Sequence, residues 1–544
     1  MKKAFLVIGL AVTLFAFHSF EYFYADYLRA QAKSNGGTTW TETVTNGQTT
    51  FAVPWLSNID YITKINAIRQ TGVPGDPYSG DTRLKSWLLD SAMHYIIYGW
   101  CRLFKRLDIG FTFFAFLCPS LWFIWAMLYF RKLLPESDFW ERVFYSLLMS
   151  EFLQAFIALS GGFSVGKALY HAINFGVMYR GAVSCLPSPL FSSLFAVAWW
   201  GWFSLSRGKS ILTNILLGLC AGLMPLVHPP EYIFCLGVIG MTYILSAENR
   251  ARTMIILCLA LVVGIICLSF GGTFDRAEKM QSIATQGRWA TIPYLVAGVV
   301  CIWRSAKADK LFWSAVGSTL IMVAIAVNLD LVINVPLEMS VLERFLKPVI
   351  LIALIKLAHD YVGPQIRAVA RVAVGVMLCV VFFNAKSSAE KHYLFAGLPI
   401  EWEEHIDWLN NKTDKGSIVL TMSPLLSKLI ATHTHNRQII GDGHPTIGST
   451  PRDENLKNTG ILANTLGIGE EEFVWRYYTP TNGDLNKNLY YNQGDISEFM
   501  FCLDGFVNVS QYPRQPFLDP ILKSMRENKK FSKNYTVWMS PENN

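Results

Sequence analysis

Eleven apolar stretches alternate with short polar turns over the first 384 residues of the chain. Almost every second turn carries a small cluster of basic residues. The clusters are Lys2/Lys3, Arg131/Lys132, Arg207/Lys209, Arg250/Arg252, Arg304/Lys307/Lys310 and Arg367/Arg371. Because Lys and Arg beside a membrane span are retained on the cytoplasmic side, the alternation predicts eleven transmembrane helices with the N-terminus inside.

Each apolar stretch predicts one helix, and several are near or below the roughly 20 residues that cross a bilayer. The predicted spans are residues 4–24, 111–130, 139–159, 184–205, 211–226, 233–245, 254–270, 292–303, 311–329, 345–358 and 368–383. The first begins like a secretory signal but has no small-x-small cleavage site, which indicates an uncleaved signal-anchor. Residues 160–183 are apolar but contain His171 and Arg180, which favours an outward-facing or re-entrant element.

This pattern divides the chain into a membrane domain, residues 1–384, and an outer α/β domain, residues 385–544. A large first outer loop, residues 25–110, belongs to the membrane domain and is expected to hold interfacial helices. In the tail, a helical apolar stripe around Trp402 is followed by the strand SIVLT, a helix after Pro424 and the strand QIIGDG. The Asn-, Gly- and Thr-rich stretch 445–492 is predicted to form loops, and FVNVSQY and YTVWM further strands.

Composition supports a membrane protein. The chain is 52% hydrophobic and 16% charged, with a mean hydropathy of +0.30, which is too apolar for a soluble protein of this length. The net charge of +7 does not indicate nucleic-acid binding, because the excess lies before residue 385 (31 basic, 21 acidic), while the tail has 16 basic and 19 acidic residues. No CxxC or zinc-type Cys/His spacing is present. A disulfide between Cys101 and Cys185 on the outer side is left as an open alternative.

The first outer loop contains the acidic residues with the clearest chemical potential. Asp60 precedes a predicted helix in which isoleucines recur at three-residue spacing until Gly72. A carboxylate at the membrane edge, beside an interfacial helix, suits general-base chemistry on a bound hydroxyl or amide. Asp76 and Asp81 follow in a Pro/Gly turn, where the alternative is that they are solvated turn residues.

In this layout the sequence resembles the GT-C superfamily of membrane glycosyltransferases, which use polyprenyl-phosphate-linked sugars. The strings that carry the resemblance are DYITKINAIRQTGVPGDP, HYIIYGWCRLFKRLDIGF, LMPLVHPPEY, SVLERFLKPVILIAL and WLNNKTDKGSIVLT, in that order. Two subgroup motifs are missing: the Trp-Trp-Asp-Tyr-Gly motif of oligosaccharyltransferases and the Asp-Glu pair after the first span of aminoarabinose transferases. The resemblance therefore implies the superfamily and no subgroup.

The resemblance implies that Asp60 is the catalytic or acceptor-orienting acid, with Asp76 as a second candidate. It also implies outward-facing cations for the donor phosphate. Arg suits this role because its planar fork meets phosphate bidentately, and Arg288 and Arg344 with Lys347 are expected at the outer interface. Arg344 has alternatives, since it could pair with Glu343 or Glu338 or act as a topological anchor.

His228 and Glu231, in the string HPPEY, lie at the outer end of a predicted span, where polar groups usually face a cavity. The alternative is a helix end at the two prolines with His228 capping carbonyls. His171 is a weaker candidate, and the tail residues His433, His435 and His444 are expected to be solvated and not to bind metal. No cofactor is required by the residues, although Asp60, Asp76 and Glu231 could hold Mg or Mn, since some family members use a divalent ion.

The implied reaction is an inverting displacement at the periplasmic face of a bacterial inner membrane. The partners are a polyprenyl-phosphate-sugar donor, the lipid bilayer and a glycan, lipid or protein acceptor such as a pilin. Two other classes stay open: a lipid or polymer flippase or transporter, and a non-catalytic envelope scaffold. Against a transporter, the spans lack the Gly/Pro-broken helices and matching halves of inverted repeats.

Overall fold

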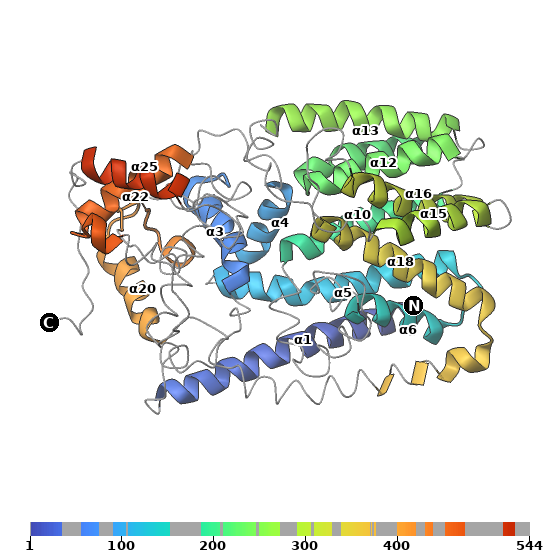
Figure 1. The fold of residues 1–544 in the computed structure, drawn as a ribbon. Helices are drawn as coiled ribbons and strands as arrows, with labels where there is room; N and C mark the ends of the chain where they lie inside the picture. Colours follow the sequence, from blue (N-terminus) through green and yellow to red (C-terminus); the bar gives the residue numbers. More distant parts are fainter. Residues whose placement is uncertain are drawn as a thin grey trace, which may run out of the picture. The chain divides into compact units, whose positions relative to one another are not determined.

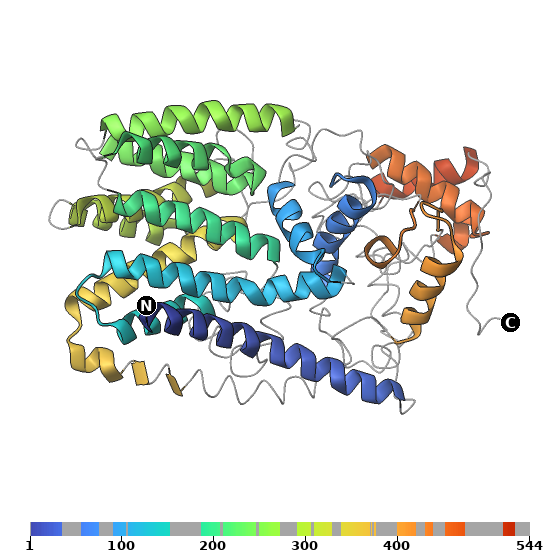
Figure 2. The same cartoon turned by 180° about the vertical axis from the view of Figure 1, so that it is seen from behind.

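The computed structural model of the chain is mostly helical (Figures 1 and 2). It describes residues 2–34, 56–74, 91–104, 107–152, 187–206, 210–245, 250–271, 291–305, 309–328, 339–369, 371–372, 375–376, 400–419, 430–438, 452–473 and 515–527. These residues belong to two compact units. The helical unit comprises residues 1–31, 88–101 and 109–396, and the loop–tail unit comprises residues 32–87, 102–108 and 397–544.

The helical unit follows the predicted apolar stretches closely. Its helices are α1 (Lys2–Ser34), α4 (Ser91–Cys101), α5 (Leu107–Leu133), α6 (Phe139–Leu147), α10 (Pro187–Leu205), α11 (Ile211–Gly222), α12 (Pro229–Leu245), α13 (Arg250–Gly271), α15 (Ile292–Ser305), α16 (Lys310–Val327) and α18 (Met339–Tyr361). A π-helical turn, Leu148–Phe152, continues α6, and a 3-10 turn, Met224–Leu226, joins α11 to α12. Long unbroken apolar runs leave few backbone alternatives to a helix, which explains the agreement.

Two described segments, Lys2–Phe20 and Arg250–Ser269, are long and apolar enough to cross a membrane by length and composition. Shorter apolar segments lie in α10, α11, α12, α15 and α16. The eleven crossings and the side on which the N-terminus lies therefore stay predictions.

The core of the helical unit combines aromatic packing with hydrogen bonds between helices. Trp200 on α10 donates its ring N–H to Thr319 on α16 over 3.1 Å, and Ser120 on α5 donates to the Ala11 carbonyl on α1 over 2.7 Å. Glycines allow close helix contact: a Cβ at Gly298 on α15 would lie 3.0 Å from the Gly317 carbonyl on α16, and a Cβ at Gly317 would lie 2.8 Å from the Gly298 carbonyl. Small residues and short polar side chains of this kind are the usual means by which apolar helices associate in lipid.

The loop–tail unit contains α3 (Leu56–Thr71), α20 (Ile400–Lys412), α22 (Arg452–Thr465) and α25 (Gln515–Glu527). Of the predicted order helix, strand, helix, strand, the described residues show α20, Ile418 within the predicted strand SIVLT, and helical residues 430–433. The partner of Ile418 is Arg437, which precedes the predicted strand QIIGDG by one residue. Ile418 and Arg437 form a parallel bridge. Among the described residues this single bridge is the extent of the β-structure.

The predicted loops of residues 445–492 are wrong where α22 lies. Leu456, Leu462 and Ala463 are buried on this helix, which packs on α25. The polar and Gly/Thr content hides a narrow apolar face, and helix pairing compensates for weak intrinsic propensity. The predicted strands near residues 506–512 and 535–539 and the re-entrant element at 160–183 lie outside the described residues.

Candidate functional site

Helix α3 carries Asp60 within its second turn. The predicted helix began after Asp60, and this boundary is wrong, because the helix starts at Leu56. Its predicted end is confirmed: Gly72 follows with φ of +82°, a left-handed conformation that favours glycine after a helix. Ile62 and Ile65 are buried on one face of the helix. The side chain of Asp60 lies outside the described residues, so its orientation stays a prediction.

A pair of amides fastens α3 to the tail. Asn66 is buried, and its Nδ2 donates to the carbonyls of Ala431 (2.6 Å) and Thr434 (3.0 Å), while Gln70 Nε2 also donates to the Thr434 carbonyl (3.0 Å). These carbonyls lie at the C-terminal end of a short helical segment, where backbone acceptors lack partners within the helix. The first loop and the tail, more than 360 residues apart in sequence, thus form one unit.

The same tail segment is held from a second side by α20. Asn410 donates to the His433 carbonyl over 2.9 Å, and Asn436 donates to the Thr413 hydroxyl over 2.7 Å. A ring nitrogen of His435 lies 2.9 Å from the Thr413 carbonyl. The sequence pattern did not predict this junction. Its signal is that Asn66 and Gln70, four residues apart, lie on one edge of the helix beside the isoleucine stripe, where their amides are available to bond another segment.

His228 and Glu231 come together at the start of α12. The Nδ1 atom of His228 pairs with Oε2 of Glu231, and Glu231 is only 2% exposed. The Oε1 atom of Glu231 is buried and has no hydrogen-bond partner among the described residues. The His228 backbone N–H donates to the Met224 carbonyl (2.8 Å). A buried carboxylate with one occupied and one vacant oxygen can accept a further hydrogen bond or share a proton with the imidazole.

Helix α18 packs beside α12 and carries Lys347, one of the predicted phosphate-binding residues. The rings of Phe234 on α12 and Phe345 on α18 lie 4.6 Å apart. Lys347, two residues after Phe345, is 3% exposed. The predicted span at 345–358 begins too late, because α18 starts at Met339 and so includes Glu343 and Arg344. The side chains of these two residues lie outside the described part of the chain.

The remaining candidates also fall outside the described residues. They are Asp76, Asp81, Arg288 and His171. Cys101 is buried, and its proposed partner Cys185 is not described, so the predicted bridge stays untested. Within the described part of the chain no group of three or more His, Cys, Asp or Glu side chains is placed to hold a metal ion, and the predicted divalent cation stays open.

No family model matches the chain, and no curated protein matches it in sequence. Similar solved structures include three of the oligosaccharyltransferase from Archaeoglobus fulgidus, all 11% identical. The apo form has a TM-score of 0.42 over 91% of this chain and 68% of the other. The complex with Zn and sulfate has a TM-score of 0.40 over 71% and 58%. The AglB complex with an inhibitory peptide and a dolichol-phosphate has 0.38 over 70% and 60%.

In two of these three cases the chain spans less than two thirds of the protein that it resembles. The likeness concerns an arrangement of helices, and an activity does not follow from a shared arrangement.

Proposed function

We propose that the protein is a GT-C type membrane glycosyltransferase, which transfers a sugar from a polyprenyl-phosphate-linked donor to a glycan, lipid or protein acceptor at the periplasmic face. The observation that carries the proposal is the docking of α3, the helix with Asp60, onto the tail through Asn66. A catalytic acid must be held to within a fraction of an ångström, and a loop helix fastened to a folded domain meets this requirement.

The chemistry assigned to these residues is a single displacement. Asp60 accepts the proton of the acceptor O–H or N–H as the acceptor atom bonds to the anomeric carbon of the sugar. The bond from that carbon to the phosphate oxygen breaks at the same time, and its electron pair leaves with the polyprenyl phosphate. Lys347 and Arg344 stabilise the negative charge of the leaving phosphate, and the configuration at carbon is inverted.

A second observation, on buried ionisable residues, supports a donor site at α12 and α18. His228 and Glu231 are paired at the start of one helix, and Lys347 lies near the start of the other. A carboxylate and an ammonium buried at the ends of packed apolar helices are costly, and ionisable groups in such places usually serve a site. The proposal therefore assigns this region to binding of the phosphate and the sugar hydroxyls.

The test is transfer from a radiolabelled polyprenyl-phosphate sugar to endogenous acceptors in membranes that contain the protein. Asp60→Asn should lower the rate by on the order of 10²- to 10⁴-fold, the usual contribution of a general base. The matched control is Asp407→Asn, an exposed carboxylate on α20, which should transfer at the wild-type rate. Full activity of Asp60→Asn rules out the assigned base, and absence of transfer by the wild type with every donor tested rules out the enzyme class.

A further inference from the structure

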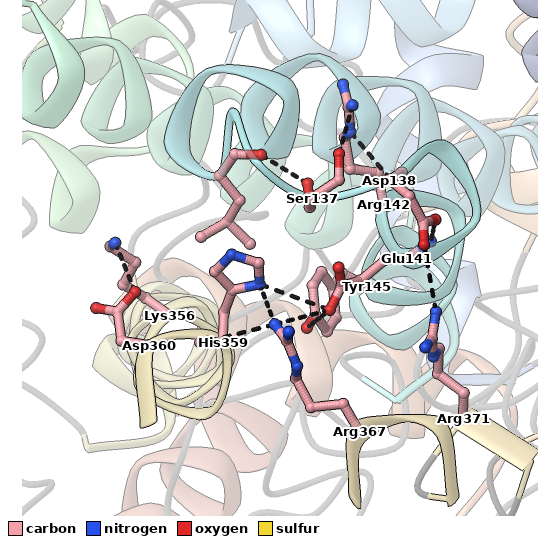
Figure 3. A network of polar contacts seen from close by, with 11 residues as sticks. Ser137, Asp138, Glu141, Arg142, Tyr145, Lys356, His359, Asp360, Arg367 and Arg371 are labelled. Carbon is pink, nitrogen blue, oxygen red and sulfur yellow. Dashed lines mark hydrogen bonds and ion pairs between the residues drawn. The ribbon is translucent and has the colours of Figure 1, made fainter. Parts of the chain in front are cut away.

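A second polar cluster lies at the opposite end of α18 from Lys347, between the last turns of this helix and α6 (Figure 3). A short segment after α18, residues 364–369 with 371 and 372, is attached there, and we call it the Arg367 segment. Arg367 reaches a single carboxylate oxygen, Oε1 of Glu141, over 3.0 Å. Tyr145 donates to the same oxygen over 2.8 Å, and His359 Nδ1 lies 3.5 Å from it.

The contact between Arg367 and His359 depends on the protonation of the imidazole. Arg367 Nη1 lies 2.5 Å from His359 Nδ1. A guanidinium has donors only, so this contact is a hydrogen bond only when Nδ1 accepts, that is, in a neutral imidazole with its proton on Nε2. The same Nη1 lies 3.2 Å from the His359 backbone carbonyl, which fixes the guanidinium beside the ring.

Protonation of His359 removes this arrangement. Nδ1 would then carry a proton that points at a guanidinium nitrogen, so that two donors and two positive charges face each other. Glu141 is 6% exposed, and its Oε1 already accepts from Tyr145. The protonated imidazole would compete with Arg367 for this one oxygen. The side chains of His359 and Arg367 are 14% and 18% exposed, so solvent protons can reach the ring.

The other charges near the cluster are paired among themselves. The remaining pairs are Arg371 with Asp138 (3.8 Å), Lys356 with Asp360 (2.8 Å) and Asp309 (3.1 Å), and Arg304 with Asp360 (3.6 Å). Arg142 donates to the Ser137 carbonyl (2.6 Å). Of the described acidic groups in the cluster, Glu141 is the one in contact with His359. A protonated His359 and Arg367 therefore compete for this one carboxylate.

We propose that His359 and Glu141 form a proton-controlled latch, which holds the Arg367 segment on α6 and α18 while the imidazole is neutral and releases it when the imidazole is protonated. Histidine is the side chain whose charge changes most readily between pH 5 and 8, so the two states of the latch are compared at a neutral and at a mildly acidic pH. The segment connects α18 to the tail in the chain. Its release therefore frees the start of this connection from α6 and α18.

The test is hydrogen–deuterium exchange of the full-length protein in lipid nanodiscs at pH 7.5 and 5.5, with exchange times corrected for the intrinsic effect of pH. In the wild type, exchange of a peptide spanning residues 363–372 should be on the order of tenfold faster at pH 5.5. His359→Gln should abolish this difference, because its amide oxygen accepts from Arg367 at both pH values. Glu141→Gln should give fast exchange at both pH values, because the carboxylate charge is lost.

The matched control is His435→Gln in the loop–tail unit, which should leave the pH difference of this peptide unchanged. The latch is overturned if the wild-type peptide exchanges equally at the two pH values, or if His359→Gln keeps the difference. Wild-type protection in Glu141→Gln would equally exclude it. Exchange of peptides from α10 and α13 reports whether each variant is folded. If one variant is misfolded, the wild type and the other variant decide the test.

Discussion

At the scale of single residues, the structure draws attention to side chains whose partners are far away in sequence. Asn66 looks like an ordinary polar position in an amphipathic helix, yet it is 1% exposed and bonds two tail carbonyls. Glu141 follows a loop with basic and acidic residues, yet it is buried against Arg367. Burial of an amide or a carboxylate is tolerated only when partners are supplied, so these residues fix where distant segments meet.

Replacing Asn66 should weaken the loop–tail unit. In Asn66→Ala, the carbonyls of Ala431 and Thr434 lose a buried donor, and the expected loss is about 1–3 kcal/mol of unfolding free energy. Chemical denaturation of the purified protein, followed by protease cleavage within the tail, measures it. Asn411→Ala, an exposed asparagine of α20, is the matched control and should unfold like the wild type. Equal stability of both variants would contradict the docking.

The ion pair between Glu470 and Arg526 should make the stability of this unit depend on pH. Arg526 donates to both carboxylate oxygens (2.7–3.0 Å), and these hydrogen bonds lower the pKa of Glu470. Because the folded-state pKa lies below the ordinary value of about 4.3, the stabilisation is present above that value and is lost as pH falls through the folded-state pKa.

For this exposed pair the effect should be below about 1 kcal/mol. Unfolding curves between pH 3 and pH 6 measure it, and Arg526→Gln should remove this part of the pH dependence. If the variant keeps the full wild-type dependence, the pair does not contribute.

At the scale of elements, the apolar stretches predict most helices of the helical unit to within a few residues, although α1 continues to Ser34 and α18 starts as early as Met339. Close contacts between these helices depend on glycine. A Cβ at Gly298 on α15 would lie 2.7 Å from Ile321 Cγ1 and 3.0 Å from the Gly317 carbonyl on α16. By contrast, the Cβ position of Gly240 on α12 has no atom of another described segment within 4 Å. The two positions look alike in the sequence, because each is a glycine within an apolar helix.

The replacement of each glycine by alanine should therefore have opposite effects. Gly298→Ala forces α15 and α16 apart and should lower stability by about 1–3 kcal/mol. Gly240→Ala restricts the unfolded chain without a clash and should be neutral or stabilising by up to about 1 kcal/mol. Thermal unfolding in detergent compares the two. A destabilised Gly240→Ala with an unaffected Gly298→Ala would show that the helices pack differently.

At the scale of the whole molecule, residues of the basic clusters that are predicted to share one side of the membrane contact residues at the ends of neighbouring helices. Lys3 lies 5.8 Å from the ring centroid of Phe139 at the start of α6, and Arg252 of α13 donates to the Phe203 carbonyl near the end of α10 (2.9 Å). Arg367 pairs with Glu141 on α6. Each of these contacts joins helix ends near predicted basic clusters within the helical unit, and the side of the membrane that they face stays a prediction.

Which side of the membrane this end faces is testable in cells. The positive-inside rule places Lys132 in the cytoplasm and Lys412 in the periplasm. With a membrane-impermeant maleimide, Lys412→Cys should be labelled in intact cells, and Lys132→Cys only after permeabilisation. The wild-type protein, with its ten native cysteines, provides the background. The reverse pattern would invert the proposed orientation and remove Asp60 from the periplasmic face.

The sequence by itself determined the positions of the apolar helices, the end of α3 at Gly72 and the grouping of basic helix ends, because these depend on periodicity, local backbone preference and charge along the chain. It did not determine α22, whose apolar face is too narrow to stand out from polar neighbours. Only the tertiary structure decided that Asn66 meets the tail, that Glu231 is left with a vacant oxygen and that Glu141 faces His359 and Arg367. Such contacts depend on which surfaces meet, and the chain's local pattern carries no record of a partner hundreds of residues away.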